Sequence, residues 1–258
     1  MKPLRKRALG NTGIQIARLS LGTVKLGRDR GVKYPDPVSI PNDKAARELL
    51  DCALDLGINT LDTAPAYGTS ESRLGRLIAD ERERWVLCTK VGEEYEDGQS
   101  SFDFTPEHCR FSVERSLTRL GTDVLDIVLI HSDGNDREIL QTHGTLDALK
   151  DLKQEGKIRA VGISHKTPAG GALAISMGAD VIMATLNRDY QAEAGLIGQA
   201  AAQGCGVLIK KALRSGHGQA QDLADVAAHA GVHSIVVGTT NPAHLRANAR
   251  VLIEAGFG

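Results

Sequence analysis

The stretch NTLDTAPAYG at positions 59–68 decides the fold, because a buried strand ends inside it in a titratable side chain. Its first half is strand-like, and the proline and glycine in its second half break the strand. Asp62 stands at the strand end, and Tyr67 follows in the loop. Two later apolar strands end in Lys90 and in His131. In a parallel barrel the carboxyl ends of the strands meet at one face, where active sites lie, so these four side chains are predicted to meet there.

Strand-like and helix-like segments alternate along the chain at the spacing of βαβ units. The predicted strands are short apolar runs at 16–23, 58–62, 85–90, 124–130, 159–163, 180–184, 205–209 and 234–237. A first helix is predicted after Asn42 or Asp43, and further helices at 70–80, 106–120, 143–155, 166–178, 192–203, 218–230 and 241–255. Eight alternating units predict an α/β fold, a (β/α)8 TIM barrel. An N-terminal β-hairpin is expected over residues 4–16, and a long loop over 24–42.

Composition narrows the class of protein. The chain has 258 residues, 41% of them apolar, and no linker or composition shift, so a single domain over residues 1–258 is predicted. The net charge of −1 directs it neither to nucleic acid nor to anionic membranes. No signal peptide and no span of about 20 apolar residues is found. The scattered cysteines indicate reduced thiols and a cytoplasmic protein. No metal site is predicted, since Gly231 separates His229 from His233.

Three motifs in this order resemble the aldo-keto reductase superfamily. They are Asp-Thr-Ala-x-x-Tyr-Gly at 62–68, Thr-Lys-Val-Gly at 89–92 and Ile-His-Ser at 130–132. The resemblance implies a barrel whose floor is capped by the N-terminal hairpin, and a catalytic tetrad. The tetrad falls on Asp62, Tyr67, Lys90 and His131. Compared with the family, the large loop after strand seven and the long C-terminal loop are missing, so we expect an open substrate pocket.

The tetrad suits the reduction of a carbonyl group, which needs a hydride and a proton. No side chain supplies a hydride, so a cofactor must. Tyr67 is the expected proton donor, and an adjacent Lys90 ammonium would lower the pKa of its phenol from the ordinary value of about 10. Asp62 would keep Lys90 charged. The resemblance implies that His131 donates a hydrogen bond to the carbonyl oxygen of the substrate, orienting it or sharing in the proton relay.

No GxGxxG motif follows a strand, so a nicotinamide cofactor would bind without the Rossmann fingerprint. By resemblance, Ser164 would hold the carboxamide together with His165, which replaces the usual Asn. Met183 replaces a Gln, and Lys210 or Lys211 would lie beside the diphosphate. The predicted cofactor-binding residues are Gly22, Thr23, Ser164, His165, Lys211, Leu213, Ser215, Gly238, Thr239, His244 and Asn248.

The segment 238–248 is the predicted turn from strand eight into the last helix, and helix N-termini bind phosphate through free N–H groups. A Lys and an Arg that are common in the family fall on Gly238 and His244. Two cations are thus lost, for which Thr239, His244 and Arg246 could compensate. NADP(H) is favoured as the cofactor with a modest preference, and NAD(H) is the alternative.

Two other functions compete with a carbonyl reductase. A family member that binds nicotinamide and regulates a partner would keep the same tetrad. A metal-dependent hydrolase on the same barrel would want a His-x-His pair at strand one, which the segment 19–22 does not contain. The expected partner is a small carbonyl compound, with neither nucleic acid nor membrane. The identity of the substrate, the direction of the reaction and the oligomeric state stay open.

Overall fold

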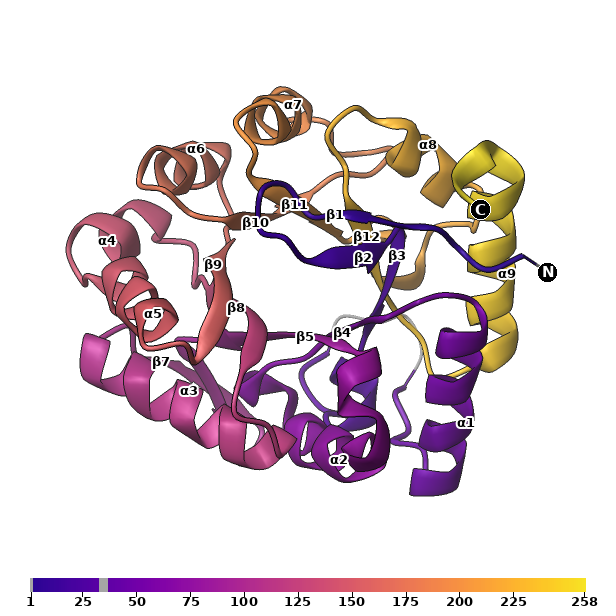
Figure 1. Cartoon of the computed structure of the whole chain (residues 1–258), viewed down its shortest axis with the longest axis horizontal. Helices are drawn as coiled ribbons and strands as arrows, with labels where there is room; N and C mark the ends of the chain where they lie inside the picture. Colours follow the sequence, from indigo (N-terminus) through magenta and orange to yellow (C-terminus); the bar gives the residue numbers. More distant parts are fainter. Residues whose placement is uncertain (1, 33–36) are drawn as a thin grey trace.

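A closed parallel barrel is the centre of the computed structural model, which describes residues 2–32 and 37–258 (Figure 1). Eight strands of the described chain close it in the order β10-β11-β12-β3-β4-β5-β8-β9. They are β3 Leu19–Gly22, β4 Thr60–Asp62, β5 Val86–Val91, β8 Leu125–His131, β9 Ile158–Ser164, β10 Val181–Thr185, β11 Gly206–Lys210 and β12 Ser234–Gly238. The predicted (β/α)8 barrel is confirmed.

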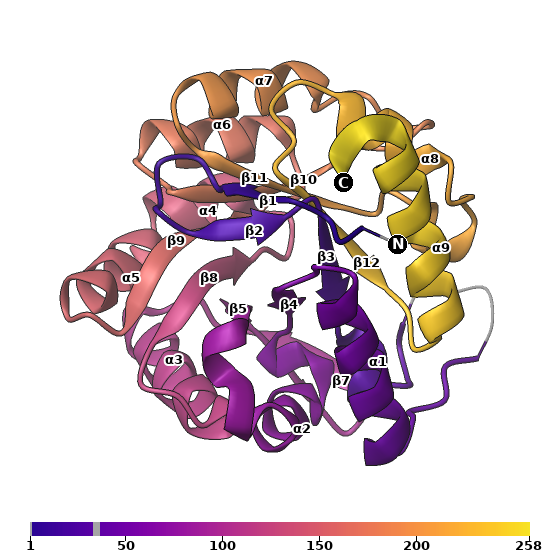
Figure 2. The ribbon, with the colours of Figure 1, turned by 45° about the vertical axis from the view of Figure 1, so that its right-hand side comes forward.

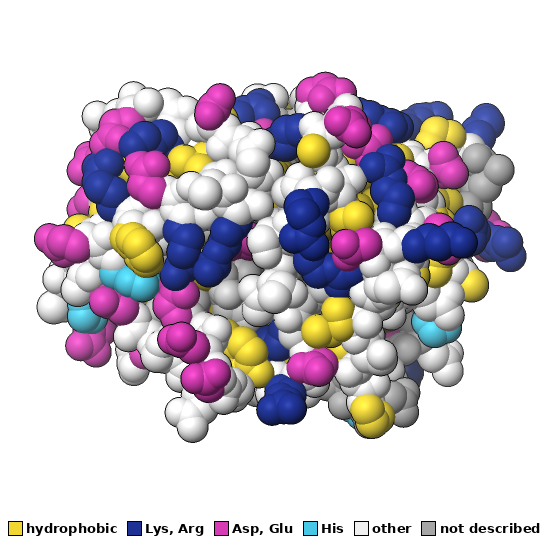
Figure 3. All heavy atoms as spheres, turned by 90° about the horizontal axis from the view of Figure 1, so that it is seen from below, with side chains coloured by type: hydrophobic (Ala, Val, Ile, Leu, Met, Phe, Trp, Pro, Cys, Tyr) yellow, Lys and Arg dark blue, Asp and Glu magenta, His cyan; other side chains and the backbone are white. Residues whose placement is uncertain are grey.

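Helices surround this barrel on its outside (Figures 1 and 2). They are α1 Asp43–Asp55, α2 Ser70–Leu77, α3 Pro106–Leu120, α4 Asp136–Gln141, α5 Thr145–Gln154, α6 Pro168–Ser176, α7 Ala194–Ala202, α8 Asp222–Ala228 and α9 Pro242–Leu252. Asn42 caps α1, because its side chain accepts a hydrogen bond from the Ala45 N–H at 2.9 Å. None of the described helices is long and apolar enough to cross a membrane. The face seen in Figure 3, below α1, α2 and α3, carries basic and acidic side chains interspersed.

The alternation of side chains along the strands separates two hydrophobic clusters. The larger one lies between the strands and the helices. The smaller one fills the lumen with Val86, Cys88, Ile127, Leu129, Ala160, Val181, Met183 and Leu208. The hairpin of β1 Lys6–Ala8 and β2 Gln15–Ala17 adds Leu9, Ile14 and Ile16 to the lumen cluster and lies across one end of the barrel (Figure 1). The floor is therefore closed, and a site can open only at the carboxyl ends of the strands.

The structure differs from the predicted elements in a few places. β6 Glu93–Glu96 and β7 Gln99–Phe102 form a hairpin where no element was predicted. The first barrel strand begins at Leu19 rather than at residue 16, because 15–17 pair within the N-terminal hairpin. The short helix α4 precedes the predicted helix 143–155. Part of the predicted loop 24–42 is a 3-10 turn, η1 Val24–Leu26, and its residues 33–36 lie outside the described residues.

Candidate active site

The last inward-facing residues of five strands converge on one cavity at the open end of the barrel. Asp62, Lys90, His131, Ser164 and Lys210 all line this cavity, whose volume is about 340 Å³. In β5, β8 and β11 the lining residue comes two positions after an apolar side chain of the lumen cluster. Since side chains alternate between the two faces of a strand, the same pattern that fills the lumen places these polar groups on top of it.

Lys90 is a fully buried ammonium held between two oxygen atoms. Its Nζ donates to Asp62 Oδ1 at 2.7 Å and to the backbone carbonyl of Thr63 at 2.8 Å. The same Nζ lies 4.8 Å from the centroid of the Tyr67 ring. Burial by itself lowers the pKa of Lys90, but the charge of the Asp62 carboxylate and its hydrogen bond, together with the acidic groups of Tyr67 and Cys88, outweigh it and raise the pKa above its ordinary value. Lys90 is therefore positively charged at neutral pH.

Tyr67 is carried by a short turn, η2 Pro65–Tyr67, which follows β4. A Cβ atom at Gly68 would lie 2.2 Å from the carbonyl oxygen of Gly27, and Gly68 has a φ of +61°. Both facts require glycine there, and the close approach fixes the turn that carries the phenol. The Tyr67 ring meets His131 edge-on, with 6.2 Å between the ring centroids. The four residues predicted as a tetrad are thus neighbours in one cavity.

Glu93 is a residue of this cavity that the sequence reasoning missed. It is the first residue of β6, and its Oε2 lies 2.8 Å from Nδ1 of His131. Its other oxygen accepts a hydrogen bond from Ser100 Oγ at 2.7 Å and lies 3.8 Å from Arg28. The Asp-Gly pair at 97–98, with positive φ at both residues, is a strong signal for the hairpin that delivers Glu93.

Ser164 ends β9 and Lys210 ends β11, on either side of β10, and the two side chains meet at the barrel mouth. Lys210 Nζ donates to Ser164 Oγ at 2.9 Å and to the carbonyl of His165 at 2.5 Å. Burial, together with the charge of Lys211, lowers the pKa of Lys210 to about 7. The sequence left open which of the two lysines enters the site. Both border the cavity, but only Lys210 belongs to strand β11.

The structure places the side chain of His165 apart from the other predicted cofactor residues. Its side chain is completely buried and lines neither this cavity nor the second cavity described below. Its Nε2 lies 3.5 Å from Glu193 Oε2, just before α7, and its Nδ1 lies 3.0 Å from the carbonyl of Thr167. Since Ser164 is the last inward-facing residue of β9, the next side chain turns to the helix layer. A contact of the His165 side chain with a carboxamide is therefore not supported.

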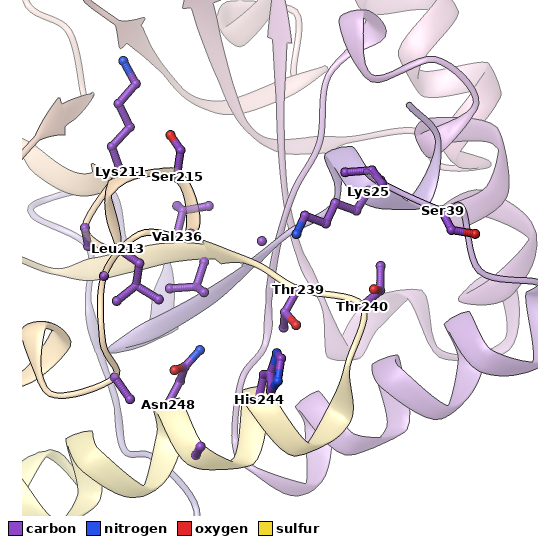
Figure 4. A pocket seen from close by; sticks show the side chains of 18 of the residues that line it. Lys25, Ser39, Lys211, Leu213, Ser215, Val236, Thr239, Thr240, His244 and Asn248 are labelled. Carbon is purple, nitrogen blue, oxygen red and sulfur yellow. The ribbon is translucent and has the colours of Figure 1, made fainter. Parts of the chain in front are cut away.

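A second cavity, of about 550 Å³, is shown in Figure 4. It continues from the first, because the two have lining residues in common. The two share Lys211, Ser215, Val236 and Gly238 in their walls. Figure 4 shows Lys25 approaching from one side, and His244 and Asn248 rising from α9. Among the predicted cofactor residues, Gly22, Thr23 and Ser164 line the first cavity, and Lys211, Leu213, Ser215, Gly238, Thr239, His244 and Asn248 line the second.

The paired cavities fit an elongated anionic ligand such as a dinucleotide. Lys25 and Lys211 supply positive charge in the second cavity, and the first turn of α9 borders it. Ser164 and the Lys210 amine offer polar groups for an amide at the deep end. These residues could hold a nicotinamide dinucleotide with its nicotinamide end beside Tyr67 and His131.

Comparison with known proteins agrees with this geometry. The model of the Aldo/keto reductase family matches residues 18–187. The L-galactose dehydrogenase of Arabidopsis thaliana is 37% identical over 171 residues, 64% of this chain and 49% of that protein. An uncharacterized oxidoreductase of Bacillus subtilis is 35% identical over 169 residues, 64% of this chain and 50% of that protein. The chain spans about half the length of these curated relatives.

Solved structures extend the similarity over almost the whole chain. A Pseudomonas aeruginosa protein described as a candidate aldo-keto reductase superposes with a TM-score of 0.91 at 47% identity, covering 98% of this chain and 97% of that one. An aldo-keto reductase from Bacillus halodurans, in its holo form, superposes with a TM-score of 0.79 at 25% identity, covering 96% and 91%. The family match includes the strands that carry Asp62, Lys90 and His131. The chain therefore belongs to the aldo/keto reductase family.

Proposed function

We propose that this protein is an oxidoreductase that transfers a hydride between a nicotinamide cofactor and a small carbonyl compound, reducing an aldehyde or ketone or oxidising the alcohol. One observation carries the proposal. A buried ammonium, Lys90, is fixed by Asp62 and faces the ring of Tyr67 in a cavity that continues into a second, cationic one. Family membership and the oxidoreductase names of the curated relatives support it.

The residues of this chain manage the proton, while a bound cofactor supplies the hydride. Tyr67 gives its phenolic proton to the carbonyl oxygen of the substrate. Lys90 stabilises the phenolate that remains, because its charge faces the ring from a fully buried position. Asp62 holds the ammonium in place, so this stabilisation needs no rearrangement during the reaction. In the reverse direction the same phenolate accepts the proton of an alcohol.

The second cavity would hold the remainder of the cofactor. Ser164 is placed to bind the carboxamide, and Lys211 lies in the wall shared by the two cavities, where a diphosphate would pass. We favour NADP(H), because His244, Thr239 and the first turn of α9 lie together in the second cavity and suit a phosphate, and we keep NAD(H) as the alternative.

Titration of the protein with NADPH and with NADH, followed by nucleotide fluorescence, tests cofactor binding directly. Turnover is then measured with a panel of small aldehydes for the wild type and Tyr67→Phe. This variant removes the proton and keeps the ring, so the rate should fall by about 10²–10⁴-fold while cofactor affinity changes little. Tyr190→Phe is the matched control, since Tyr190 lines neither cavity, and it should leave the rate unchanged.

The outcomes separate the competing functions. Binding without turnover of any aldehyde or alcohol favours a nicotinamide-binding regulator. A near wild-type rate for Tyr67→Phe contradicts the proton-donor role. If neither nucleotide binds, the proposal of a nicotinamide enzyme is wrong.

A further inference from the structure

The amine of Lys210 is a second cation of the first cavity, and it differs from Lys90 in its partners. Its Nζ donates to Ser164 Oγ at 2.9 Å and to the backbone carbonyl of His165 at 2.5 Å, and both acceptors are uncharged. Within the described part of the chain no carboxylate lies at ion-pair distance from this amine, whereas Asp62 lies 2.7 Å from Lys90. The charge of Lys210 is therefore not neutralised by a neighbouring acid.

The amine lies at the wall where a nicotinamide ring is expected. Ser164 ends β9 and Lys210 ends β11, and β10 between them contributes the uncharged side chain of Met183 to the same cavity. Ser164 is the residue assigned to the carboxamide in the proposed function. Because the carboxamide is attached directly to the nicotinamide ring, a ring held by Ser164 lies close to the amine that holds the same hydroxyl group.

The hydrogen bond between Lys210 and Ser164 serves both oxidation states of such a ring. The amine donates to Ser164 Oγ, so the hydroxyl hydrogen stays free to donate to the carboxamide oxygen. This oxygen is present in the oxidised and in the reduced cofactor. The two forms differ in charge instead, since the oxidised ring is a cation and the reduced ring is neutral.

We propose that Lys210 makes the site discriminate between the oxidation states of a nicotinamide cofactor, by weakening the binding of the oxidised form relative to the reduced form. This deepens the proposed function and rests on it. Like charges repel more strongly in a partly buried site than in water, and Lys210 is partly buried at the edge of the cavity. An enzyme cannot change the overall equilibrium of its reaction. In a mixture of both nucleotides, however, this one would be loaded with the reduced form and so be poised to reduce carbonyl compounds.

The discrimination should depend on pH, because Lys210 titrates near neutrality. Burial lowers the pKa of this amine, and the charges of Lys211 and Lys90 add to the effect, while Glu193 and Asp136 oppose it. The resulting pKa is about 7. The discrimination should therefore be present at pH 6.5 and fade as the pH rises to 9.5, where the amine is neutral. The phosphates of the nucleotide are the same in both oxidation states, so they shift this range equally for both.

Two histidines also face the charge of Lys210. Burial lowers the pKa of His131 below its ordinary value of 6.5, and it lowers the pKa of His165 to about 4. Neither ring is therefore charged at pH 8. A variant of Lys210 separates the effect of the amine from any titration of His131.

Calorimetric titration with NADP⁺ and with NADPH tests the proposal by binding alone, and NAD⁺ and NADH replace them if only NADH binds. Lys210→Gln keeps a donor for Ser164 and removes the charge. At pH 6.5 the ratio of the dissociation constants, oxidised over reduced, should be about tenfold larger in the wild type than in this variant. The wild-type ratio should fall toward that of the variant by pH 9.5. A ratio that neither the variant nor the pH changes overturns the proposal.

Lys166→Gln is the matched control. Lys166 borders the same cavity, but its Nζ donates to the carbonyl of Asp133 at 2.9 Å and not to Ser164. The ratio of the dissociation constants should therefore stay at its wild-type value. Equal effects of the two variants would mean that the overall charge of the cavity sets the ratio, and the role given to Lys210 would be wrong.

Proton exchange on binding supplies a readout that a merely structural role would not move. Titrations at pH 7 in two buffers of different ionisation enthalpy count the protons that each nucleotide takes up or releases. The oxidised nucleotide should leave Lys210 with fewer protons than the reduced one does, because its ring charge lowers the pKa of the amine. The difference should vanish in Lys210→Gln. Equal proton counts for both nucleotides in the wild type would overturn the proposal.

The outcomes keep the two levels of the argument apart. If no nucleotide binds, the proposed function and the role of Lys210 fail together. If both oxidation states bind and Tyr67→Phe loses its activity, but the ratio does not respond to Lys210→Gln, only the role of Lys210 is rejected.

Discussion

Replacing Asp62 by Asn should destabilise this protein strongly, because it leaves the Lys90 ammonium buried without a counter-charge. The side chain of Lys90 is 1% exposed and that of Asp62 is 5% exposed. After the substitution the ammonium keeps the Thr63 carbonyl at 2.8 Å as its acceptor and loses the carboxylate at 2.7 Å.

The magnitude follows from the distance and the burial. At 2.7 Å and an effective dielectric constant of about 20, the attraction between the two charges is roughly 6 kcal/mol before desolvation is counted. Breaking a buried pair by removing one partner typically costs about 3–5 kcal/mol. We expect a loss in this range in the free energy of unfolding at pH 7.

The stability deficit of Asp62→Asn should also depend on pH. In the wild type the raised pKa of Lys90 means that the stabilisation is complete below its unfolded-state pKa and is lost only as the pH rises through the folded-state value. Without Asp62, burial lowers the pKa of Lys90 instead. The deficit of the variant should therefore be largest at neutral pH and shrink as the pH approaches 10, where the amine can lose its proton.

Urea unfolding at pH 7 and at pH 9.5 measures both effects. Glu155→Gln is the control, because it breaks the Arg110–Glu155 pair of the same 2.7 Å length on the exposed surface, and it should change the midpoint far less. The double variant Asp62→Leu/Lys90→Met should recover much of the loss, since an apolar pair leaves no buried charge. A deficit for Asp62→Asn as small as that of the control would refute the reasoning.

Three further predictions concern other parts of the barrel. His244→Arg should lower the dissociation constant of NADPH by about tenfold and leave that of NADH unchanged, because a guanidinium binds phosphate bidentately; equal changes for both nucleotides would count against a 2′-phosphate site there. Lys210 has a folded-state pKa of about 7 against an ordinary 10.5, so its destabilising effect is complete at pH 6 and relieved by pH 10. Lys210→Met should thus gain roughly 4 kcal/mol more stability, relative to the wild type, at pH 6 than at pH 10, and urea titrations that show no such difference would contradict the burial of the charge. Gly162→Ala should cost about 3 kcal/mol or more in thermal or urea unfolding, because its Cβ would lie 1.6 Å from the Val181 carbonyl oxygen, whereas Gly198→Ala, with open space around it, should not destabilise the protein.

Much of the architecture was predictable from the sequence, because it depends on short-range patterns of apolar and polar residues. The spacing of apolar runs predicted the eight barrel strands, and the residues that end them, Asp62, Lys90 and His131, do meet at one cavity. The alternation of side chains along each strand also contained information that the sequence analysis did not use. Leu208 faces the lumen, so Lys210 must face the cavity, and Ser164 faces it, so His165 must not.

Other features had no local pattern from which to be predicted. The Asp-Gly pair predicts a hairpin at 97–98, but not where that hairpin lies. Glu93 comes after a strand has ended, beyond Gly92 with its φ of +101°, so strand alternation says nothing about its direction. It reaches His131 because the hairpin packs on the segment after β3, with Arg28 stacked on Tyr95. The sequence by itself thus determined the barrel and the side of each strand that faces its lumen, since both follow from short-range periodicity. Only the tertiary structure decided that Glu93 meets His131, because that contact joins segments from different βα units that meet when the barrel closes.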